Sequence, residues 1–370
     1  MMLQIEAIDT LFFRDGKPFE MGDEVWANGI FPPLPSVFYG AIRTAYFSQY
    51  PEKLALANTD DDPTKGLKIK GIYLSKGGTV YIPIPADFAS PKKSGGKEIL
   101  FQRNNLDEKV FSSSKTVLNP YKEEVEKADG FIDIYSNNAF DDFFEDTQNQ
   151  ASGFVKSEKL FSKELKIGIG RQNATRTTEE GKLYRVAMNR MEVAGNPNEK
   201  LSFLVDTNIE EVWREDFKPN FLKLGGENKI AQCKIYDIEI EFPKPEIQKF
   251  FKLYFLTPTI FKNGWLPNEF EYDQSQNAYI GTWKGVKLKL IRSFVNGSVA
   301  VGGFDVKEKQ PKTMYKAVPA GTVYHFEISG NSQNLDIHQT FGNPNEPLSD
   351  IYPEQGFGLS MVGLLNETPS

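Results

Sequence analysis

The sequence predicts an α+β protein with two domains built on largely antiparallel sheets. Its 370 residues suit two domains better than one small core. Alternation of apolar and polar residues recurs in many short segments, whereas a helical pattern is clear only over residues 36–50. A parallel doubly wound sheet would need a helix between most of its strands, so antiparallel sheets with few crossover helices are expected.

The first domain is expected to open with a strand over residues 3–9, in which Leu3, Ile5 and Ala7 share a face. A shaped loop follows. Residues 67–85 predict a β-hairpin, because two alternating runs flank Gly77-Gly78 and this pair suits a tight turn.

A helix is predicted to start at Pro35-Ser36 and to end at Tyr50-Pro51, with Ser36 as its N-cap. Four residues, Val37, Ala41, Thr44 and Ala45, are expected to share the face that packs on a sheet. Gly40 and Ala41 are small, which would let the helix lie close to that sheet.

Further strands are predicted over 182–193, 200–207, 235–242 and 252–261, from the same alternation. Residues 86–150 have little pattern and read as a long insertion. Within it, "DDFFED" at 141–146 predicts a helix start with a buried aromatic pair. "PKPE" at 243–246 suggests a junction, so the predicted domains are 1–243, with the insertion, and 244–370.

Two short segments suggest an internal duplication. "TLFFRDG" at 10–16 and "TIFKNG" at 259–264 match when one Phe is skipped, and each follows an opening strand. The match is short, but the equivalent placement makes it better than a chance similarity.

Composition indicates a soluble, cytoplasmic protein. The first residues lack a basic region and an apolar core, so no signal peptide is expected, and no apolar run approaches the ~20 residues that a membrane span needs. The single cysteine, Cys233, excludes an intramolecular disulfide and is expected to be a small buried residue.

Charge is unevenly distributed along a chain whose net charge is −7. Residues 156–190 hold nine basic and four acidic residues, and residues 284–316 hold eight basic and two acidic ones. Two such segments can form a local positive groove on an acidic body, because salt limits the reach of a charge to ~8–10 Å. The alternative is ordinary fluctuation of charge along a soluble chain.

Catalytic motifs are scarce. The two histidines, His325 and His338, are not spaced as metal ligands, so no metal site and no cofactor are expected. His325 lies in a strand pattern and is expected to be structural. His338 lies nearer a glycine loop and is more open to a ligand-binding role.

Glycines adjoin basic residues in four segments: 168–177, 222–229, 299–321 and 354–365. Glycine lets a backbone amide approach an anion, and Lys or Arg neutralises phosphate. Phe or Tyr between them can stack on unpaired bases. The alternative is that these glycines form ordinary turns and bulges, with "GIGRQNATRT" as an exposed hairpin. Four clusters together favour binding of an extended polyanion.

The ordered motifs resemble a known family. "DTLFFRDGKPF", "PPLPSVFYGAIRTAYF", "KIGIGRQNATRTTEEGKLY", "LGGENK", "LTPTIFKNGWLP", "PKTMYKAVPAGTVYHFE" and "GFGLSMVG" occur in this order. The set is similar to the third-subunit family of the Cmr complex, the type III-B CRISPR RNA-guided effector, within the RAMP superfamily. The resemblance covers nearly the whole chain outside 86–150.

The resemblance implies two ferredoxin-like (RRM-like) domains with antiparallel sheets and long insertions. It implies a subunit that is not an enzyme, binds the 5′ handle of the guide crRNA and joins the large polymerase/cyclase-like subunit to the repeated backbone subunits. In this role the chain would associate with target RNA only indirectly, through the rest of the complex, and would take part in antiviral defence. The RNA-binding residues it implies are Arg14, Lys17, Arg43, Gly168, Gly170, Arg171, Thr175, Arg176, Lys312, Gly356, Phe357, Gly358 and Ser360.

Two alternatives stay open at this point. A metal-independent RAMP endoribonuclease that processes CRISPR transcripts would need a general base such as His325 or His338. A purely structural interaction protein would hold no RNA on residues 166–185.

Overall fold

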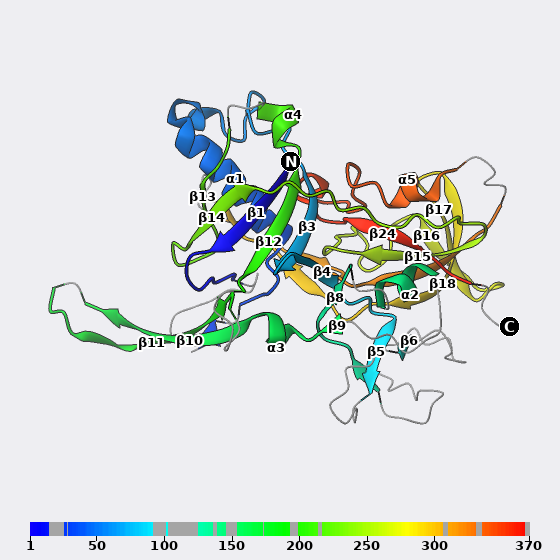
Figure 1. Ribbon diagram of the computed structural model, residues 1–370, viewed down its shortest axis with the longest axis horizontal. Coiled ribbons are helices and arrows are strands. Elements are labelled where there is room, and N and C mark those ends of the chain that lie inside the picture. Colours follow the sequence, from blue (N-terminus) through cyan, green and yellow to red (C-terminus); the bar gives the residue numbers. More distant parts are fainter. Residues whose placement is uncertain are drawn as a thin grey trace. The chain divides into compact units, whose positions relative to one another are not determined.

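The computed structural model forms two compact units in the part of the chain that it describes (Figure 1). Unit 1 comprises Met1–Ile69, Glu158–Asp237 and Ala300–Tyr315, and unit 2 comprises Lys70–Ser157, Ile238–Val299 and Lys316–Ser370. The described residues are 1–14, 26–27, 29–91, 101–102, 125–135, 139–145, 154–172, 174–192, 199–213, 217–305, 310–330 and 335–366. The predicted boundary at 243/244 stays a prediction.

Unit 1 has a sheet in which antiparallel strands follow the order β13-β14-β1-β12. These strands are β1 Met2–Ala7, β12 Leu201–Thr207, β13 Phe221–Lys223 and β14 Ile230–Ile235. Leu3 lies opposite Val205 on one side and Ile235 on the other. The strands predicted near 3–9 and 200–207 are therefore confirmed.

The strand predicted over 235–242 is wrong beyond its first residue. β14 pairs with β1, and β1 begins at Met2. The Tyr236 amide donates to the Met2 carbonyl at 3.0 Å. Because β1 begins at Met2, it offers no strand residue with which residues after Tyr236 could pair. A strand needs a neighbour for its backbone hydrogen bonds, so alternation alone could not extend it.

Helix α1, Pro35–Gln49, packs on this sheet through large side chains. Phe38 meets Phe203 of β12 edge-on at 5.0 Å between ring centroids, and Ile42 and Tyr46 continue the buried face. The predicted end at Tyr50 is confirmed, but the N-cap is Leu34 rather than Ser36. The predicted face is wrong apart from Ala41, because burial follows the aromatic residues and not the small ones.

The other described elements of unit 1 are short, apart from one long hairpin. They are β2 Trp26–Ala27, η1 Pro51–Leu56, α3 Ser157–Leu160, β10 Ser162–Arg171, β11 Thr178–Arg190, α4 Ile209–Trp213, β20 Phe304–Asp305 and β21 Gln310–Pro311. β19 Val299–Val301 and β22 Tyr315–Ala317 form a two-stranded sheet. The division of the chain into two units falls within each of these strands, at 299/300 and at 315/316.

Unit 2 contains a sheet in the order β16-β17-β18-β23-β15-β24, with antiparallel neighbours throughout. A buried aromatic and aliphatic cluster that includes Phe251, Leu288, Phe326 and Phe341 forms its core. The strands are β15 Phe250–Phe255, β16 Phe270–Asp273, β17 Ala278–Trp283, β18 Val286–Phe294, β23 Val323–Ile328 and β24 Ser360–Leu364, with α5 Ile337–Phe341 and η3 Pro353–Gln355 before β24.

A second group of strands in unit 2 follows the order β3-β4-β8-β9. The predicted Gly77-Gly78 hairpin is confirmed, since both glycines have positive φ. Most of the predicted insertion at 86–150 lies outside the described residues. The strands of this group are β3 Ile69–Lys76, β4 Thr79–Pro83, β8 Phe131–Asp133 and β9 Phe154–Val155. A separate sheet in the order β6-β5-β7 contains β5 Phe88–Pro91, β6 Phe101–Gln102 and β7 Val125–Lys127.

Helix α2, Ala139–Glu145, carries the aromatic pair predicted in "DDFFED". Phe143 and Phe144 are each 2% exposed, as expected. Phe143 contacts Tyr254 of β15 at 5.2 Å between ring centroids, which joins the helix to the core of unit 2.

The two segments that suggested a duplication occupy equivalent places. β1 lies between β12 and β14, and β15 lies between β23 and β24. After each of these central strands comes a buried threonine, Thr10 or Thr259. A β-bridge to another segment lies at the same place, from Leu11, next to Thr10, to Asn189 and from Thr259 itself to Val318. Both sheets are antiparallel and helices are few, as the α+β prediction requires.

Candidate nucleic-acid interface

The stretch "KIGIGRQNATRTTEEGKLYR" forms the outer part of a long hairpin of β10 and β11, which extends as an arm in Figure 1. The antiparallel register runs from Ser162 opposite Arg190 to Ile169 opposite Leu183 and shifts before Arg171, which lies opposite Thr178. Gly168 and Gly170 are therefore strand residues near this irregularity. The hairpin reading of the motif is confirmed.

The tip of the hairpin is held by its own polar groups. The Arg176 amide donates to the Gln172 carbonyl at 2.9 Å, and the Gln172 amide donates to the Thr177 carbonyl at 3.0 Å. The Thr175 hydroxyl donates to Gln172 Oε1 and lies 2.7 Å from the Thr177 hydroxyl. Arg176 has φ 56° and an exposed side chain, so the turn presents a guanidinium outward.

The base of the hairpin is joined to the first loop. The Leu11 amide donates to the Asn189 carbonyl at 2.8 Å, and the Asn189 amide donates back to Leu11 at 2.7 Å. Phe12 packs with Val186 and Met188 of β11. Arg14, at the end of this loop, is exposed and bridges to Gly29; Lys17 lies outside the described residues.

The loop "LGGENK" packs against the same point. The Gly226 amide donates to the Phe12 carbonyl at 2.8 Å. Gly225 has φ 79°, and a Cβ there would lie 2.4 Å from that carbonyl oxygen, so only glycine fits. The first loop, the 222–229 loop and the base of the hairpin at residues 186–189, which lies outside the predicted glycine segment 168–177, therefore meet around Phe12.

Carboxylates accompany several cations of this junction. Lys166 pairs with Glu227 at 3.5 Å, Lys229 with Asp9, and Arg190 with Glu164. The hydrogen bond from Lys229 lowers the pKa of Asp9, and the hydrogen bond to Glu164 raises the pKa of Arg190. These pairs fix the base of the hairpin, and Lys223 lies exposed on β13 beside them.

Arg43 is engaged inside unit 1. Its guanidinium donates to Asp62 at 2.6 Å, to Thr64 at 2.6 Å and to Asn58 at 2.9 Å. It also lies over the Tyr39 ring at 5.7 Å. This network gives Arg43 a structural role, and its predicted contact with RNA would have to compete with these bonds.

Lys312 belongs to unit 1 as well. It lies exposed after β21, and its amide donates to the Gly303 carbonyl at 2.9 Å. The glycine-rich segment at 299–321 is therefore partly a turn that holds Lys312 outward. Lys307 and Lys309 of the same segment lie outside the described residues.

The terminal glycine loop packs against the interior of unit 2. Phe357 is 0% exposed, so the prediction that its ring stacks on a base does not hold in this structure. The Gly356 amide donates to Pro353 and the Gly358 amide to Pro258, and the Ser360 hydroxyl donates to the Phe341 carbonyl at 2.6 Å. These donors are committed within the chain.

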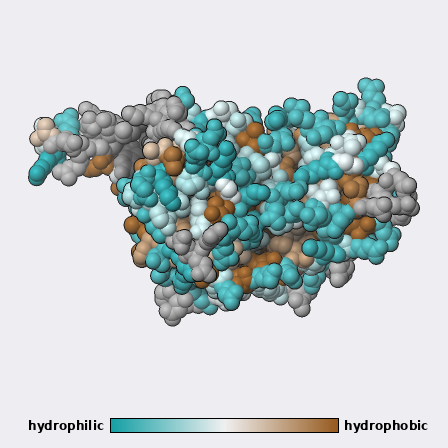
Figure 2. Space-filling view, turned by 90° about the horizontal axis from the view of Figure 1, so that it is seen from above, coloured by the Kyte–Doolittle hydropathy of each residue, from teal (hydrophilic) through white to brown (hydrophobic). Residues whose placement is uncertain are grey.

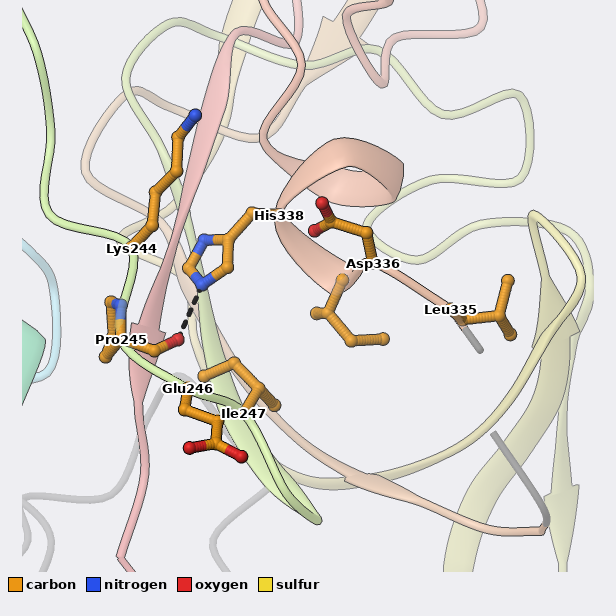
Figure 3. Close-up of a pocket in the computed structure, with 8 residues that line it drawn as sticks. Lys244, Pro245, Glu246, Ile247, Leu335, Asp336 and His338 are labelled. Atoms are coloured by element: carbon orange, nitrogen blue, oxygen red, sulfur yellow. Dashed lines mark hydrogen bonds between the residues drawn. The ribbon is translucent and has the colours of Figure 1, made fainter. Parts of the chain in front are cut away.

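Neither histidine is placed to act as a general base: His325 lies 3.5 Å from the Asp87 carboxylate, but neither of these side chains reaches solvent. His325 is 0% exposed in β23, as expected of a structural residue. His338 lines a pocket of about 300 Å³, and Figure 3 shows its ring turned toward the Pro245 carbonyl, which accepts from Nε2 at 2.7 Å. Asp336, in the same pocket, accepts from the Gln339 amide instead of orienting the imidazole.

Two kinds of feature are absent from the described residues. No group of three or more His, Cys, Asp or Glu side chains among them is arranged to hold a metal ion. Within the same residues, no helix combines the length and apolarity that a membrane crossing requires.

A family described as CRISPR-associated protein (Cas_Cmr3) matches residues 3–364. The chain belongs to the Cas_Cmr3 family. The match confirms the family that the ordered motifs indicated, and it spans both units of this Cas_Cmr3 chain. No curated protein sequence matches it.

Two solved structures share the fold of this Cas_Cmr3 chain. Both are described as cryo-EM structures of the type III-B Cmr-beta bound to cognate target RNA, one of them also with AMPPnP. The first has a TM-score of 0.51 at 17% identity, and the second 0.50 at 14%. In each case the match covers 88% of this chain and 86% of the other.

One feature of the hairpin, an exposed aliphatic face on β10, was not predicted from the sequence. Leu165, Ile167 and Ile169 lie on one face of β10 and are 60%, 64% and 50% exposed. The alternation in "LKIGI" is typical of a strand with one buried face, whereas in β10 that face is exposed. Figure 2 shows one side of the whole molecule, seen from above, with hydrophobic residues among hydrophilic ones. An arm with an exposed aliphatic face and a cationic tip suits contact with a partner beyond this chain.

Proposed function

We propose that this Cas_Cmr3 chain is a non-catalytic subunit of a type III-B CRISPR effector complex and binds the 5′ handle of the guide crRNA. In this role it also docks the large polymerase/cyclase-like subunit onto the repeated backbone subunits, and it meets target RNA only through the assembly. The complex would supply RNA-guided antiviral defence in the cytoplasm.

The meeting of the first loop, the 222–229 loop and the base of the β10–β11 hairpin around Phe12 is the observation that carries the proposal. It places the base of the β10–β11 hairpin, Arg14 and Lys223 in one region of unit 1. Arg171 ends β10, and Arg176 is displayed at the tip. Guanidinium groups bind phosphate through paired donors, and a glycine-rich strand lets a nucleotide backbone approach closely. The fold shared with chains of RNA-bound type III-B structures supports the same reading.

We extend the proposal to the fold: each sheet follows a ferredoxin-like (RRM-like) plan. In unit 2 the order β24-β15-β23-β18 places the first strand between the last and the third, as that plan requires. In unit 1, β1 lies likewise between β14 and β12, and α1 follows it in the chain. Helix α5 would be the second helix of unit 2, and the β16–β17 hairpin would stand where its first helix is expected.

The test is binding of guide RNA by the chain assembled with its large partner subunit, measured with and without the 5′ handle. We expect tighter binding of the RNA that carries the handle. Replacing Arg171 and Arg176 by Ala should weaken that binding and flatten its salt dependence by about one phosphate contact per arginine. Lys218→Ala is the control, since Lys218 is an exposed cation of unit 1 outside the three segments.

Equal affinity for the two RNAs would contradict handle recognition. An unchanged salt dependence in the double arginine variant would remove the hairpin tip from the interface. Cleavage of repeat RNA by the purified chain, lost in His338→Ala, would instead support the endoribonuclease alternative. No contact of His338 favours that alternative, because Nε2 is bonded to a backbone carbonyl.

A further inference from the structure

Helical turn η1 carries apolar side chains that the chain itself does not bury. Leu54 is 58% exposed and Leu56 is 39% exposed, and no residue of η1 is buried. Apolar side chains of a short surface helix normally pack on the core, because burial of a Leu is worth about 1.5–3 kcal/mol. Leu54 and Leu56 therefore form a small apolar patch on this turn, and what surrounds the patch decides whether it suits a partner.

The turn is nevertheless held firmly in place. It follows α1 directly, and Lys53 donates to the Tyr46 hydroxyl at 3.2 Å and lies over the Tyr50 ring at 4.4 Å. Lys53 is thus directed back toward the end of α1. Leu54 and Leu56 are presented on a fixed turn and not on a frayed end.

The loop after η1 is equally well built. Asp62 accepts from the Arg43 guanidinium, from the Asn58 amide at 2.7 Å and from the Thr64 amide at 2.8 Å. The Trp213 indole donates to the Pro63 carbonyl at 2.8 Å, which ties α4 to the same loop. This polar framework orders the loop without burying the leucines. Leu54 and Leu56 are therefore exposed beside a well-ordered loop.

The charge around the leucines is acidic. Glu52, Asp60 and Asp61 are exposed in this segment, and Glu210 and Glu211 are exposed on the adjoining α4. Lys65 is paired with Asp60 at 3.6 Å. An acidic rim repels RNA phosphates and attracts lysine or arginine side chains of a protein. We call Leu54, Leu56, Glu52, Asp60 and Asp61 the η1 surface.

We propose that the η1 surface docks a protein subunit that presents an apolar hollow rimmed by Lys or Arg. Leu54 and Leu56 would fill the hollow, and the carboxylates would meet the basic rim. The inference rests on the proposed function only in assuming that the chain works inside a multi-subunit complex. It assigns this end of unit 1 to protein, whereas the hairpin and the junction around Phe12 are assigned to RNA.

The test uses the full chain, tagged and co-expressed with the other protein subunits of its complex and a guide RNA. Leu54→Asp/Leu56→Asp is compared with the natural chain, and the masses and stoichiometry of the purified assemblies are measured together with bound RNA. Ile8→Asp/Ile235→Asp is the matched control, because these aliphatic residues of unit 1 are exposed to similar degrees, 58% and 45%. All four positions are exposed, so the variants should fold.

We expect the η1 variant to lose one protein subunit, with about a tenfold or greater fall in affinity, as for the loss of central apolar anchors of an interface. Asp60→Lys/Asp61→Lys should also weaken that association, with an effect that fades as salt is raised. The control variant should retain every subunit.

Four results would overturn the inference. Retention of all protein subunits by the η1 variant is one, and an equal loss in the control variant is another. Loss of guide RNA with all proteins retained would assign the surface to RNA. A dimer of the isolated chain that the η1 variant abolishes would assign it to a second copy. Handle preference in the natural complex is measured separately, so the proposed function can fail or hold independently.

Discussion

The ammonium group of Lys252 lies 3.8 Å from the carboxylate of Asp87, and neither side chain is exposed to solvent. His325 Nε2 lies 3.5 Å from the same carboxylate oxygen, and the Phe143 ring centroid is 5.4 Å from Lys252 Nζ. Burial raises the pKa of the neighbouring Tyr254, and the charge of Asp87 adds to the effect. Unit 2 therefore contains a charged cluster in its core, remote from solvent and hence from RNA.

Removing Asp87 should destabilise the protein strongly. Asp87→Asn leaves the Lys252 ammonium buried without its carboxylate, which is expected to cost about 3–5 kcal/mol in the free energy of unfolding. Lys252→Met should cost less, because His325 remains beside Asp87. In a double-mutant cycle measured by urea unfolding, the two losses should not add. Additive losses would show that the two groups do not interact.

The Asp62 network should make part of the stability depend on pH. Burial alone would raise the pKa of Asp62, but hydrogen bonds from Thr64 and Asn58 and the charge of Arg43 outweigh it, so the pKa lies below 3.8. The stabilisation is then full above that pH and is lost as the pH falls through the lowered pKa.

Asp62→Asn should accordingly cost about 1–3 kcal/mol at pH 7, as expected for hydrogen bonds to a charged group. The gap to the natural protein should close as the pH is lowered below the usual aspartate pKa of about 4 and through the lowered pKa of Asp62, a series that urea midpoints can follow. Asp60→Asn is the control, because Asp60 is fully exposed. A gap that stays constant through the acid range would rule out ionised Asp62 as the stabilising form.

Two glycines of different environment should respond in opposite ways to alanine. Gly358 has φ 81°, and a Cβ there would lie 2.2 Å from the Ser349 amide nitrogen, so Gly358→Ala should destabilise unit 2 by at least about 1–3 kcal/mol. Gly40 lies in α1, where an added Cβ would meet nothing within 4 Å, so Gly40→Ala should stabilise by about 0.5–1 kcal/mol. Thermal unfolding of both variants provides the measurement, and a stable Gly358→Ala protein would contradict the packing role of the terminal loop.

Cys233 should resist alkylation in the folded protein. Burial raises the pKa of its thiol to about 12, so little thiolate forms at about pH 8. Reaction with a thiol reagent should be slow in buffer and fast in denaturant, where the thiol regains its ordinary acidity. Rapid reaction in buffer would show that β14 opens readily.

Local sequence patterns correctly predicted those strands, and that turn, for which a neighbouring strand is available to pair. Alternation located β1 and β12, and Gly77-Gly78 located the turn between β3 and β4. The same signal failed at 236–242, because β1 offers no residue to pair with beyond Met2. The buried face of α1 was missed because Phe38 and Tyr46 find aromatic partners that lie far away in the sequence.

The candidate site was predictable in its residues but not in its assembly. Glycine beside arginine marked the hairpin, and "LGGENK" marked a turn. That the "LGGENK" loop and the base of the hairpin both reach Phe12 depends on contacts between residues more than a hundred positions apart, which no local pattern encodes. Phe357 shows the converse: a motif that suited base stacking is an interior packing motif.

The length of β10 has a consequence for a protein of net charge −7. A strand of ten residues extends ~30 Å at about 3.3 Å per residue, which is roughly three times the screening distance of ~8–10 Å at physiological salt. At Arg176 the charges of carboxylates outside the hairpin are therefore largely screened by salt. An approaching anion would sense mainly the hairpin's own charges, which over residues 166–182 are four basic and two acidic, so an acidic chain can still present a net positive hairpin end.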